Sequence, residues 1–311
     1  TRYGEKICLR IVNNFYIPLK LEQLITHTET LEILKDLTNK PSGLILIAGP
    51  CGAGKTTTLY SILAELNDPR LNISTIEDPI EYTLPNINQC QVMRKKGLNF
   101  SSFLNEFRQQ GVDVILVGET RDLATAKATI EMALTGRLVM TAIHASDTAS
   151  AIIRLDEIGI ESWQVSNSLI GVCAQRLIRR VCDNCKIAYQ PTIERLNQLG
   201  LSSNQEGLFT FYKANELQNK QIYEAKQKGH LCPDCQGLGY QGRVGLYEVM
   251  KITETLKNLI KKNAPIDIIK KTAIEEGMIT LFAYGLNLVK EGVTTLEELE
   301  KASFNYFSLE K

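Results

Sequence analysis

The sequence predicts an α/β protein built on a parallel sheet, and three observations support this fold class. A glycine-rich loop from Gly49 to Thr56 stands between an apolar run, residues 44–48, and a stretch with helical periodicity, residues 57–66. Further along, short apolar runs alternate with helical stretches, which is the order expected of a parallel α/β sheet. The 311 residues leave room for about two domains, and 44% hydrophobic and 23% charged residues are ordinary for a globular protein.

The elements of this sheet follow from the apolar patterns in chain order. Unbroken apolar runs of four to six residues are typical of strands buried on both faces, and apolar residues three or four positions apart are typical of helices. The predicted strands lie at residues 44–48, 73–76, 112–117 and 138–142. The predicted helices of this region lie at residues 57–66, 124–134, 148–158 and 163–181.

Five segments are expected along the chain. It starts at Thr1 without Met and reads directly into a strand at residues 6–12, so the first segment is expected to be the remnant of a preceding domain. Leucines 31, 34 and 37 predict an amphipathic helix in the second segment, and two overlapping capping boxes near residue 294 predict short helices in the last. The segments are 1–13, the remnant; 14–42, a connector; 43–181, the α/β core; 182–248, a module with four cysteines; and 249–311, a C-terminal helical subdomain.

The glycine-rich loop matches every position of the phosphate-binding pattern G-x-x-x-x-G-K-[ST]. Its glycines let backbone N–H groups turn toward phosphate oxygens, and the helix N-terminus adds partial positive charge. The strand before the loop and the helix after it disfavour the alternative, a chance match in an ordinary turn. We expect Lys55 to reach the β- and γ-phosphates and Thr56 to bind magnesium. The predicted nucleotide-binding residues are Gly49, Pro50, Cys51, Gly52, Ala53, Gly54, Lys55, Thr56 and Thr57.

The cysteines are of two kinds. Four stand singly, and we interpret them as small apolar residues: Cys8, Cys51, Cys90 and Cys173. The other four form two C-x-x-C pairs, and such pairs predict a tetrahedral zinc site, with four reduced thiols as the alternative. The pairs lie much further apart than the roughly 15–20 residues of compact zinc ribbons, so a subdomain must be looped out between them. The predicted zinc ligands are Cys182, Cys185, Cys232 and Cys235.

Polar residues follow three of the predicted strands. Glu77, Asp78 and Glu81 come after the strand at 73–76, Glu119 ends the next strand, and His144 follows the strand at 138–142. Because ligands of parallel sheets bind at the carboxyl ends of the strands, these side chains are expected to face the phosphate loop. Hydrolysis of a nucleotide needs a base for water and acids for magnesium, and these residues can supply both. The alternatives are solvated loop charges and, for His144, a hydrogen-bonded core histidine.

Taken together, these motifs resemble the secretion-superfamily ATPases that assemble type IV pili and drive type II secretion, often called PilB and GspE. The resemblance covers essentially all 311 residues. It implies a RecA-like P-loop NTPase core with a four-cysteine zinc module and a C-terminal helical subdomain. The resemblance rests on the phosphate loop, the four cysteines, Tyr3-Gly-Glu-Lys6 with Leu9-Arg10, Thr75-Ile-Glu-Asp-Pro-Ile-Glu-Tyr82, Val114-Ile-Leu-Val-Gly-Glu-Thr-Arg-Asp122, Ala133-Leu-Thr-Gly136, His144 and Ala174-Gln-Arg-Leu-Ile-Arg-Arg180.

The resemblance also implies roles and partners. Glu81 is then the general base, Glu119 the Walker B acid that acts on magnesium through water, and His144 a sensor of the γ-phosphate. Arg10 resembles an arginine donated to a nucleotide across a hexamer, where a guanidinium can neutralise phosphoryl charge. The implied protein is a cytosolic homo-hexamer that uses ATP, Mg²⁺ and Zn²⁺ and drives an inner-membrane platform protein, to which it binds peripherally. Its four-cysteine module favours an assembly motor over a retraction motor.

Some positions depart from the family pattern. Arg137 stands where histidine is usual, Asn105 stands where arginine is usual, and the stretch 108–113 lacks an acid and a proline. The histidine box reads His144-Ala-Ser-Asp147 rather than His-Thr-Asn-Asp. These departures leave open a second interpretation, a catalytically weakened paralogue that acts as a regulatory or structural subunit of such a motor.

Charge and hydropathy bear on two further classes of partner. A DNA translocase would share the phosphate loop, but it predicts a basic channel, and the 35 Lys and Arg residues are matched by 35 Asp and Glu residues. We therefore expect no direct nucleic-acid binding. No apolar run approaches the roughly 20 residues of a membrane span, so no membrane insertion is expected either.

Overall fold

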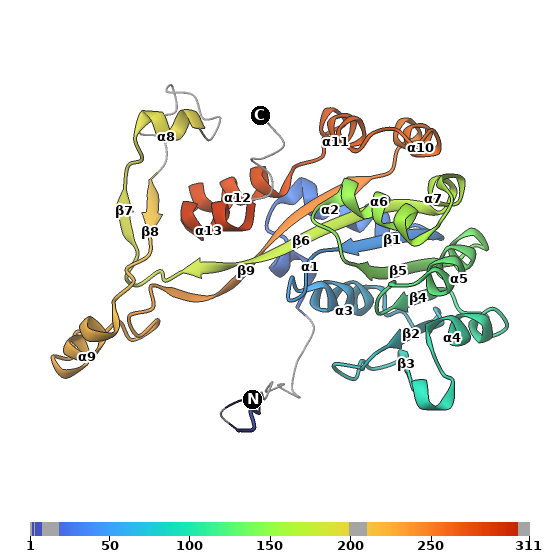
Figure 1. Cartoon of the computed structure of the whole chain (residues 1–311), viewed down its shortest axis with the longest axis horizontal. Coiled ribbons are helices and arrows are strands. Elements are labelled where there is room, and N and C mark those ends of the chain that lie inside the picture. The colour runs from blue at the N-terminus through green and yellow to red at the C-terminus, as the bar shows by residue number, and fades with distance from the viewer. Residues whose placement is uncertain (1, 3, 8–18, 199–209, 304–311) are drawn as a thin grey trace.

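The computed structural model describes residues 2, 4–7, 19–198 and 210–303 (Figure 1). One large sheet has the strand order β3-β2-β4-β5-β1-β6-β9, and two short strands, β7 and β8, pair separately. From β3 to β6 all neighbours are parallel, and β9 runs antiparallel to β6. The strands are β1 (Gly43–Ala48), β2 (Ile73–Glu77), β3 (Asn88–Gln91), β4 (Val114–Val117), β5 (Leu138–Ile143), β6 (Leu169–Val181), β7 (Ile187–Tyr189), β8 (Phe211–Lys213) and β9 (Tyr240–Lys251).

Helices cover both faces of this sheet, so its inner strands are buried on both sides. In β1, Leu44 and Leu46 pack into one hydrophobic core, and Ile45 and Ile47 pack into the other. This is why the strand is an unbroken apolar run and not an alternating one. The first core is covered by α4 (Phe100–Phe107), α5 (Leu123–Leu134), α6 (Thr148–Ile158), α7 (Ser162–Ser168), α10 (Glu254–Lys261) and α11 (Ile266–Glu275). The second is covered by α1 (Leu21–Leu24), α2 (Thr28–Thr38), α3 (Lys55–Leu66), α12 (Leu281–Lys290) and α13 (Leu296–Ser303).

The predicted parallel α/β sheet is confirmed, and so are its four predicted strands, although β4 begins at Val114 and not at 112. Helices α2, α3, α5 and α6 lie where the apolar periodicity placed them. The strand predicted at residues 6–12 falls mostly on residues 8–18, outside the described part of the chain. The division into five segments stays a prediction.

The predicted helix at residues 163–181 is wrong beyond its first turns. The structure has the short helix α7 and then β6, a strand of 13 residues from Leu169. At its start β6 lies between β1 and β9 and is buried on both faces, so its apolar run lacks the alternation that identifies a strand. Strand β9 begins at Tyr240, within the glycine-dense stretch 237–245.

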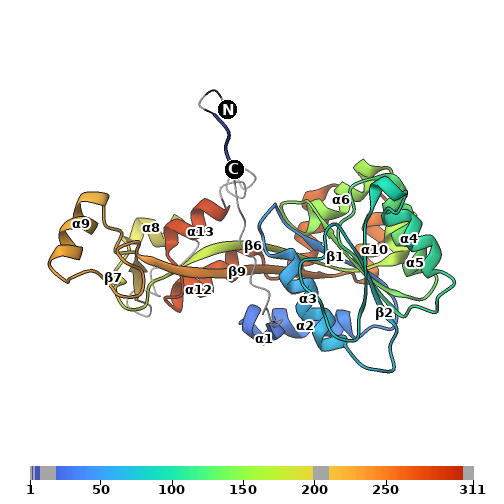
Figure 2. The same cartoon turned by 90° about the horizontal axis from the view of Figure 1, so that it is seen from below.

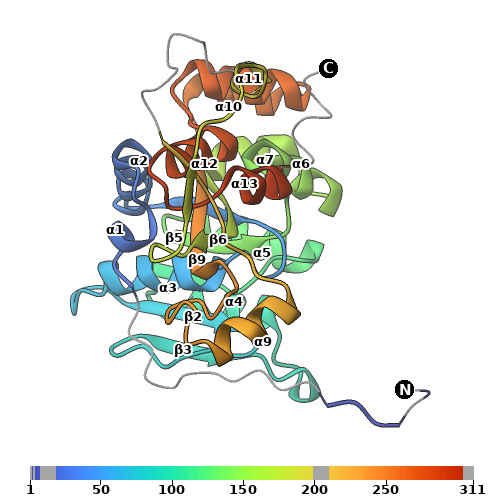
Figure 3. The same cartoon turned by 90° about the vertical axis from the view of Figure 1, so that its left-hand side faces the viewer.

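A two-stranded ribbon leads away from the sheet. The pairing of β6 with β1 ends at Ala174, and from Gln175 to Val181 the partner of β6 is β9. Figures 1 and 2 show this ribbon running from the α/β core to β7 and β8, and to α8 (Ile193–Gln198) and α9 (Asn219–Gln227). Helices α12 and α13 pack along it. Seen end-on in Figure 3, α10 and α11 lie at the opposite edge of the molecule from β3.

Candidate functional site

The phosphate loop joins the carboxyl end of β1 to the N-terminus of α3. Gly52 and Gly54 adopt left-handed φ angles of +76° and +90°, which L side chains rarely adopt. Strand β6 lies directly behind the loop: a Cβ on Gly49 would lie 2.6 Å from the carbonyl oxygen of Gln175. The Gln175 side chain donates a hydrogen bond of 2.8 Å to the Ala53 carbonyl. The glycines of the motif therefore serve both the turn and the close approach of β6.

Lys55, the first residue of α3, reaches back over the loop. Its Nζ donates to the carbonyl oxygens of Gly49 at 2.8 Å and Pro50 at 2.9 Å. Partial burial lowers the pKa of this ammonium group from its usual value, while the nearby Glu119 carboxylate opposes the shift. Backbone N–H groups, a helix N-terminus and a lysine thus meet in one concave turn, which suits an anionic phosphate group.

A pocket of about 320 Å³ opens beside this loop. It brings together residues that the sequence analysis placed on four separate motifs, at the carboxyl ends of β1, β2, β4 and β5. Arg10, the proposed arginine donor, lies outside the described residues. Cys51 is exposed at the pocket, so its interpretation as an apolar filler is wrong. The polar and loop residues of the lining are Cys51, Gly52, Lys55, Thr56, Tyr60, Glu77, Asp78, Pro79, Glu81, Gly118, Glu119, Arg121 and His144.

The three acids after β2 differ in their surroundings. Glu77 is buried, and its carboxylate accepts hydrogen bonds from the hydroxyls of Tyr60 and Thr75 and, at 3.1 Å, from the Gln89 amide. Burial and this carboxylate raise the pKa of Tyr60 well above its usual value. Asp78 forms an ion pair with Arg94 at 2.7 Å. Glu81 also lines the pocket, and its backbone N–H donates to the Tyr60 hydroxyl at 3.4 Å.

Glu119 and His144 face each other across the carboxyl ends of β4 and β5. The Glu119 carboxylate lies 2.7 Å from Nε of Arg121 and 3.9 Å from Nε2 of His144. Burial, and then the positive charge of Lys55, lower the pKa of His144, whereas Glu119 acts in the opposite direction. At neutral pH the imidazole is therefore uncharged, which leaves one ring nitrogen to donate and one to accept a hydrogen bond.

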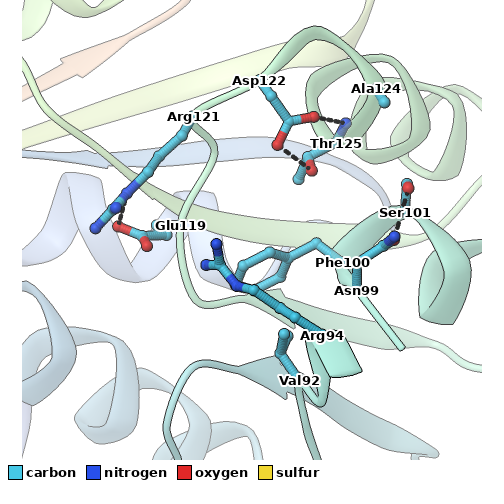
Figure 4. Close-up of a pocket in the computed structure, with 10 residues that line it drawn as sticks. All are labelled: Val92, Arg94, Asn99, Phe100, Ser101, Glu119, Arg121, Asp122, Ala124 and Thr125. Atoms are coloured by element: carbon cyan, nitrogen blue, oxygen red, sulfur yellow. Dashed lines mark hydrogen bonds and ion pairs between the residues drawn. The ribbon is translucent and has the colours of Figure 1, made fainter. Parts of the chain in front are cut away.

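A second pocket, of about 440 Å³, adjoins this one and shares Glu119 and Arg121 with it. Figure 4 shows the ion pair of these residues on one side and Arg94 with Phe100 on the other. Asp122 caps α5 by accepting hydrogen bonds from the backbone and hydroxyl of Thr125, both at 2.9 Å. The strand end that carries Glu119 is therefore tied to the start of α5.

The four paired cysteines come together in space. Their sulfur atoms all lie within 4.8 Å of one another, with Cys182 and Cys232 at 3.8 Å and Cys185 and Cys235 at 3.5 Å. A tetrahedron of thiolates with metal–sulfur bonds of about 2.3 Å has edges of about 3.8 Å, so the residues fit a tetrahedral ion. The backbone N–H of Gly239 also points at the sulfur of Cys235, at 3.3 Å.

The sequence analysis missed one residue that shapes the phosphate loop. Gln175 is fully buried and supports the loop from β6, but it falls in the stretch that was predicted to be helical. No local pattern identifies it, because its partner Ala53 lies far away in the chain. Among the described helices, none combines the length and the apolar character that crossing a membrane requires.

Comparisons with known proteins agree on one family. The model of a family described as "Type II/IV secretion system protein" matches residues 1–301. The type IV pilus assembly ATPase PilB of Thermus thermophilus is 41% identical over 299 residues, which are 96% of this chain and 32% of that protein. The type II secretion system ATPase E of Vibrio cholerae is 36% identical over 301 residues, covering 97% and 56%. The chain thus spans about a third of the first relative and just over half of the second.

Solved structures show the same fold. The pilus retraction motor PilT with bound ADP superposes with a TM-score of 0.67 at 25% identity, covering 94% of this chain and 69% of that one. The ATPase DotB of Legionella pneumophila superposes with a TM-score of 0.64 at 18% identity, covering 93% and 66%. The sheet and the helices that flank it are therefore arranged as in these two proteins.

Proposed function

The chain belongs to the type II/IV secretion system protein family, and from this membership we propose that it hydrolyses ATP to power type IV pilus assembly or type II secretion. One observation carries the proposal. Lys55, Glu81 and Glu119 converge with His144 on a single pocket beside the phosphate loop. The relatives named above are ATPases of these two systems, which supports both the reaction and the process.

Each side chain of the pocket suits one task in hydrolysis. Lys55 neutralises the β- and γ-phosphates, and Glu81 takes the proton of the attacking water. The uncharged imidazole of His144 donates a hydrogen bond to the γ-phosphate. Magnesium would be held by the Thr56 hydroxyl and, through water, by Glu119, and it would supply positive charge to the phosphoryl oxygens. Arg10 would serve a nucleotide bound by a neighbouring subunit.

The assembly and partners are part of the same proposal. We assign a homo-hexamer in the cytoplasm that acts on a platform protein of the inner membrane and so is peripheral to that membrane. Zn²⁺ held by the four cysteines would make residues 182–248 a folded module, between the ATPase core of residues 43–181 and the helical subdomain of residues 249–311. Measuring the molecular mass of the purified chain in solution over a range of protein concentrations tests the assembly directly.

The alternative, a catalytically weakened paralogue, rests on the departures from the family pattern. The structure places the two main ones away from the pocket. Asn105 is exposed on α4. Arg137 precedes β5, whereas His144 follows it, so the two residues lie at opposite ends of this strand. These positions favour the active motor.

The deciding experiment measures ATP affinity and turnover for the purified chain and two variants over a range of protein concentrations. Lys55→Ala is expected to lose both, because the lysine contacts phosphate in the ground state and in the transition state. Glu81→Gln is expected to bind ATP within about twofold of the parent and to lose turnover by about 10²–10⁴-fold, the usual contribution of a general base.

Glu254→Gln, a change at an exposed glutamate of α10, is the matched control and should change neither quantity. Turnover that rises with concentration and depends on Glu81 supports the motor. Wild-type turnover in Glu81→Gln would transfer the role of base to Asp78 or Glu77, and no turnover at any concentration would support the paralogue.

A further inference from the structure

A fully buried carboxylate lies between two helices that belong to different parts of the chain. Glu248, on β9, is 0% exposed. Its Oε1 accepts hydrogen bonds from the backbone N–H of Thr148 at 3.0 Å and from the Thr148 hydroxyl at 2.6 Å. Its Oε2 accepts a hydrogen bond from the backbone N–H of Leu281 at 3.1 Å. Each oxygen thus binds a different helix.

Both contacts are made at helix N-termini. Thr148 is the first residue of α6, and Leu281 is the first residue of α12. Backbone N–H groups there have no partner within the helix, and the helix dipole favours negative charge at that end. Glu248 therefore satisfies donors of two helices that are separated by more than a hundred residues in sequence.

The N-terminus of α6 is the continuation of the loop that carries His144. Strand β5 ends at Ile143, His144 follows, and Asp147 caps α6 by accepting a hydrogen bond of 2.7 Å from the backbone of Ser150. Only three residues separate His144 from Thr148. The position of α6 consequently limits where the imidazole can lie.

A second side chain holds the same loop. Arg176, on β6, donates to the carbonyl oxygen of Ser146 at 3.3 Å and to that of Ala302, in the last turn of α13, at 2.8 Å. The loop from His144 to Thr148 is therefore fastened at two points, to α12 through Glu248 and to α13 through Arg176. Neither fastening residue lines the pocket beside the phosphate loop.

We propose that Glu248, together with Arg176, is a positioning residue that sets His144 toward the phosphate loop and ties this histidine to the C-terminal helices. The inference rests on the proposed function, since it assigns a supporting shell to the proposed sensor of the γ-phosphate. It goes further in making hydrolysis depend on α12 and α13, which pack against the ribbon that leads to the cysteines. A shift of His144 on contact with phosphate is then transmitted to those helices.

A glutamine at this position tests the geometry because it has the shape of glutamate but only one acceptor oxygen. In Glu248→Gln, the amide NH₂ must face the backbone N–H of one helix, so one of the two fastenings is lost. Thr148→Val removes the hydroxyl donor alone and keeps the backbone contact, which gives a milder variant should Glu248→Gln fold poorly. Thr253→Ala is the control, because the Thr253 hydroxyl accepts from the backbone N–H of Leu256 in α10 and donates to Glu276, and among the described residues it has no hydrogen bond to α6 or α12.

The first measurement is hydrogen exchange of the full chain, and it needs no catalytic activity. Thr148→Val should speed exchange at residues 145–150. Glu248→Gln should speed it at residues 145–150 or at residues 281–285, according to which helix the amide NH₂ faces. Thr253→Ala should speed exchange near residues 254–258 and Glu276, and it should leave residues 145–150 and 281–285 unchanged. Unchanged exchange at residues 145–150 in both test variants would overturn the proposal, whether or not the chain hydrolyses ATP.

The second measurement is a double-mutant cycle with His144→Ala, read as turnover and as ATP affinity. If Glu248 acts through His144, Glu248→Gln should lower turnover about tenfold with ATP affinity within about twofold, and it should have little further effect once His144 is alanine. Independent, multiplicative losses would overturn the proposal. So would full turnover in His144→Ala, although ATP hydrolysis itself would then stand. A wild-type chain without turnover would refute the proposed function. In that case, hydrogen exchange alone would show whether Glu248 holds the loop from His144 to Thr148.

Discussion

Neighbouring acids in one loop can have different tasks because their surroundings differ. Both line the pocket, but Glu77 is buried and accepts hydrogen bonds from Tyr60 and Thr75, whereas Glu81, four residues later, is only half-buried. A carboxylate with its oxygens committed to buried hydroxyls is poorly placed to take a proton from water. Glu77 therefore acts as the support of the loop that presents Glu81.

This difference predicts opposite results for two identical substitutions. Glu77→Gln should reduce the free energy of unfolding by about 1–3 kcal/mol, because the amide group faces a buried hydroxyl hydrogen without accepting it. Turnover of the folded fraction should fall much less than in Glu81→Gln. Urea denaturation and ATPase assays on both variants give the comparison, and a loss of turnover in Glu77→Gln equal to that in Glu81→Gln would identify Glu77 as the base.

Arg137 is the clearest departure from the family pattern, and the structure favours a passive role for it. Its guanidinium donates to the Thr135 hydroxyl at 2.7 Å and to the Arg108 carbonyl at 3.2 Å. Arg137 and His144 flank the six residues of β5, and the seven steps between them, at about 3.3 Å each, separate them by about 23 Å. At that distance from the pocket, we do not expect Arg137 to transmit the state of a bound nucleotide.

We expect Arg137→His to leave both turnover and its pH dependence unchanged. Histidine titrates near neutral pH and arginine does not, so a relay at this position would make the pH profile sensitive to the change. The measurement is ATP turnover of both proteins between pH 6 and pH 8.5. A rise of roughly tenfold in Arg137→His, about 1.4 kcal/mol in barrier, would instead show that the parent chain is a motor slowed at this position.

At the scale of elements, the strands that the sequence reveals are those whose neighbours impose a simple pattern. β1, β2, β4 and β5 are short apolar runs, and the phosphate loop fixes which end of β1 carries the site. β6 could not be recognised in this way. Its first half is buried between β1 and β9, and its second half belongs to a ribbon with α12 and α13 against it, so the two halves obey different patterns.

The same strand explains why part of the site escaped the sequence analysis. Consecutive residues of a strand point to opposite faces. Gln175 supports the phosphate loop on one side, and Arg176 holds the loop after His144 on the other. Both contacts join residues far apart in the chain, and no local spacing encodes them. The motifs predicted to bind phosphate can be recognised in the sequence, but the residues that support these motifs through distant contacts cannot.

The cysteine cluster gives a prediction at the same scale. Around the four thiols, residues 182–186 and 232–239 form turns rather than strands or helices, so zinc is expected to supply most of the order of the module. The binding free energy of such a site is on the order of 10 kcal/mol at pH 7. Elemental analysis should find about one zinc per chain, and a chelator should unfold the module while the α/β core remains folded.

Far-ultraviolet circular dichroism and limited proteolysis can follow the removal of zinc. Cleavage should begin within residues 182–239 after chelation, and restoring zinc should restore resistance. Cys90→Ser, a change at a cysteine outside the cluster, should alter neither the zinc content nor the resistance to proteolysis. Metal-free protein with an intact module would contradict the assignment.

On the scale of the whole molecule, a compact α/β core is joined to a distal module by β6 and β9 (Figures 1 and 2). The connection is reinforced along its length. Arg179 on β6 pairs with Glu298 of α13 at 2.7 Å, and Lys186 near the cysteines donates to the Gly292 carbonyl at 2.9 Å. Core, ribbon and module are therefore linked by strands and side chains and not by a flexible loop.

The two-stranded ribbon also has the geometry of a lever arm. The seven residues of β6 beyond its last pairing with β1, Gln175 to Val181, extend about 23 Å at about 3.3 Å each. A rotation of about 10° at the root of such an arm displaces its far end by about 4 Å. Gln175 stands at that root, against the phosphate loop, and the cysteines stand at the far end. A rotation small enough to leave the packing of the core intact would thus displace the cysteine cluster by several ångströms.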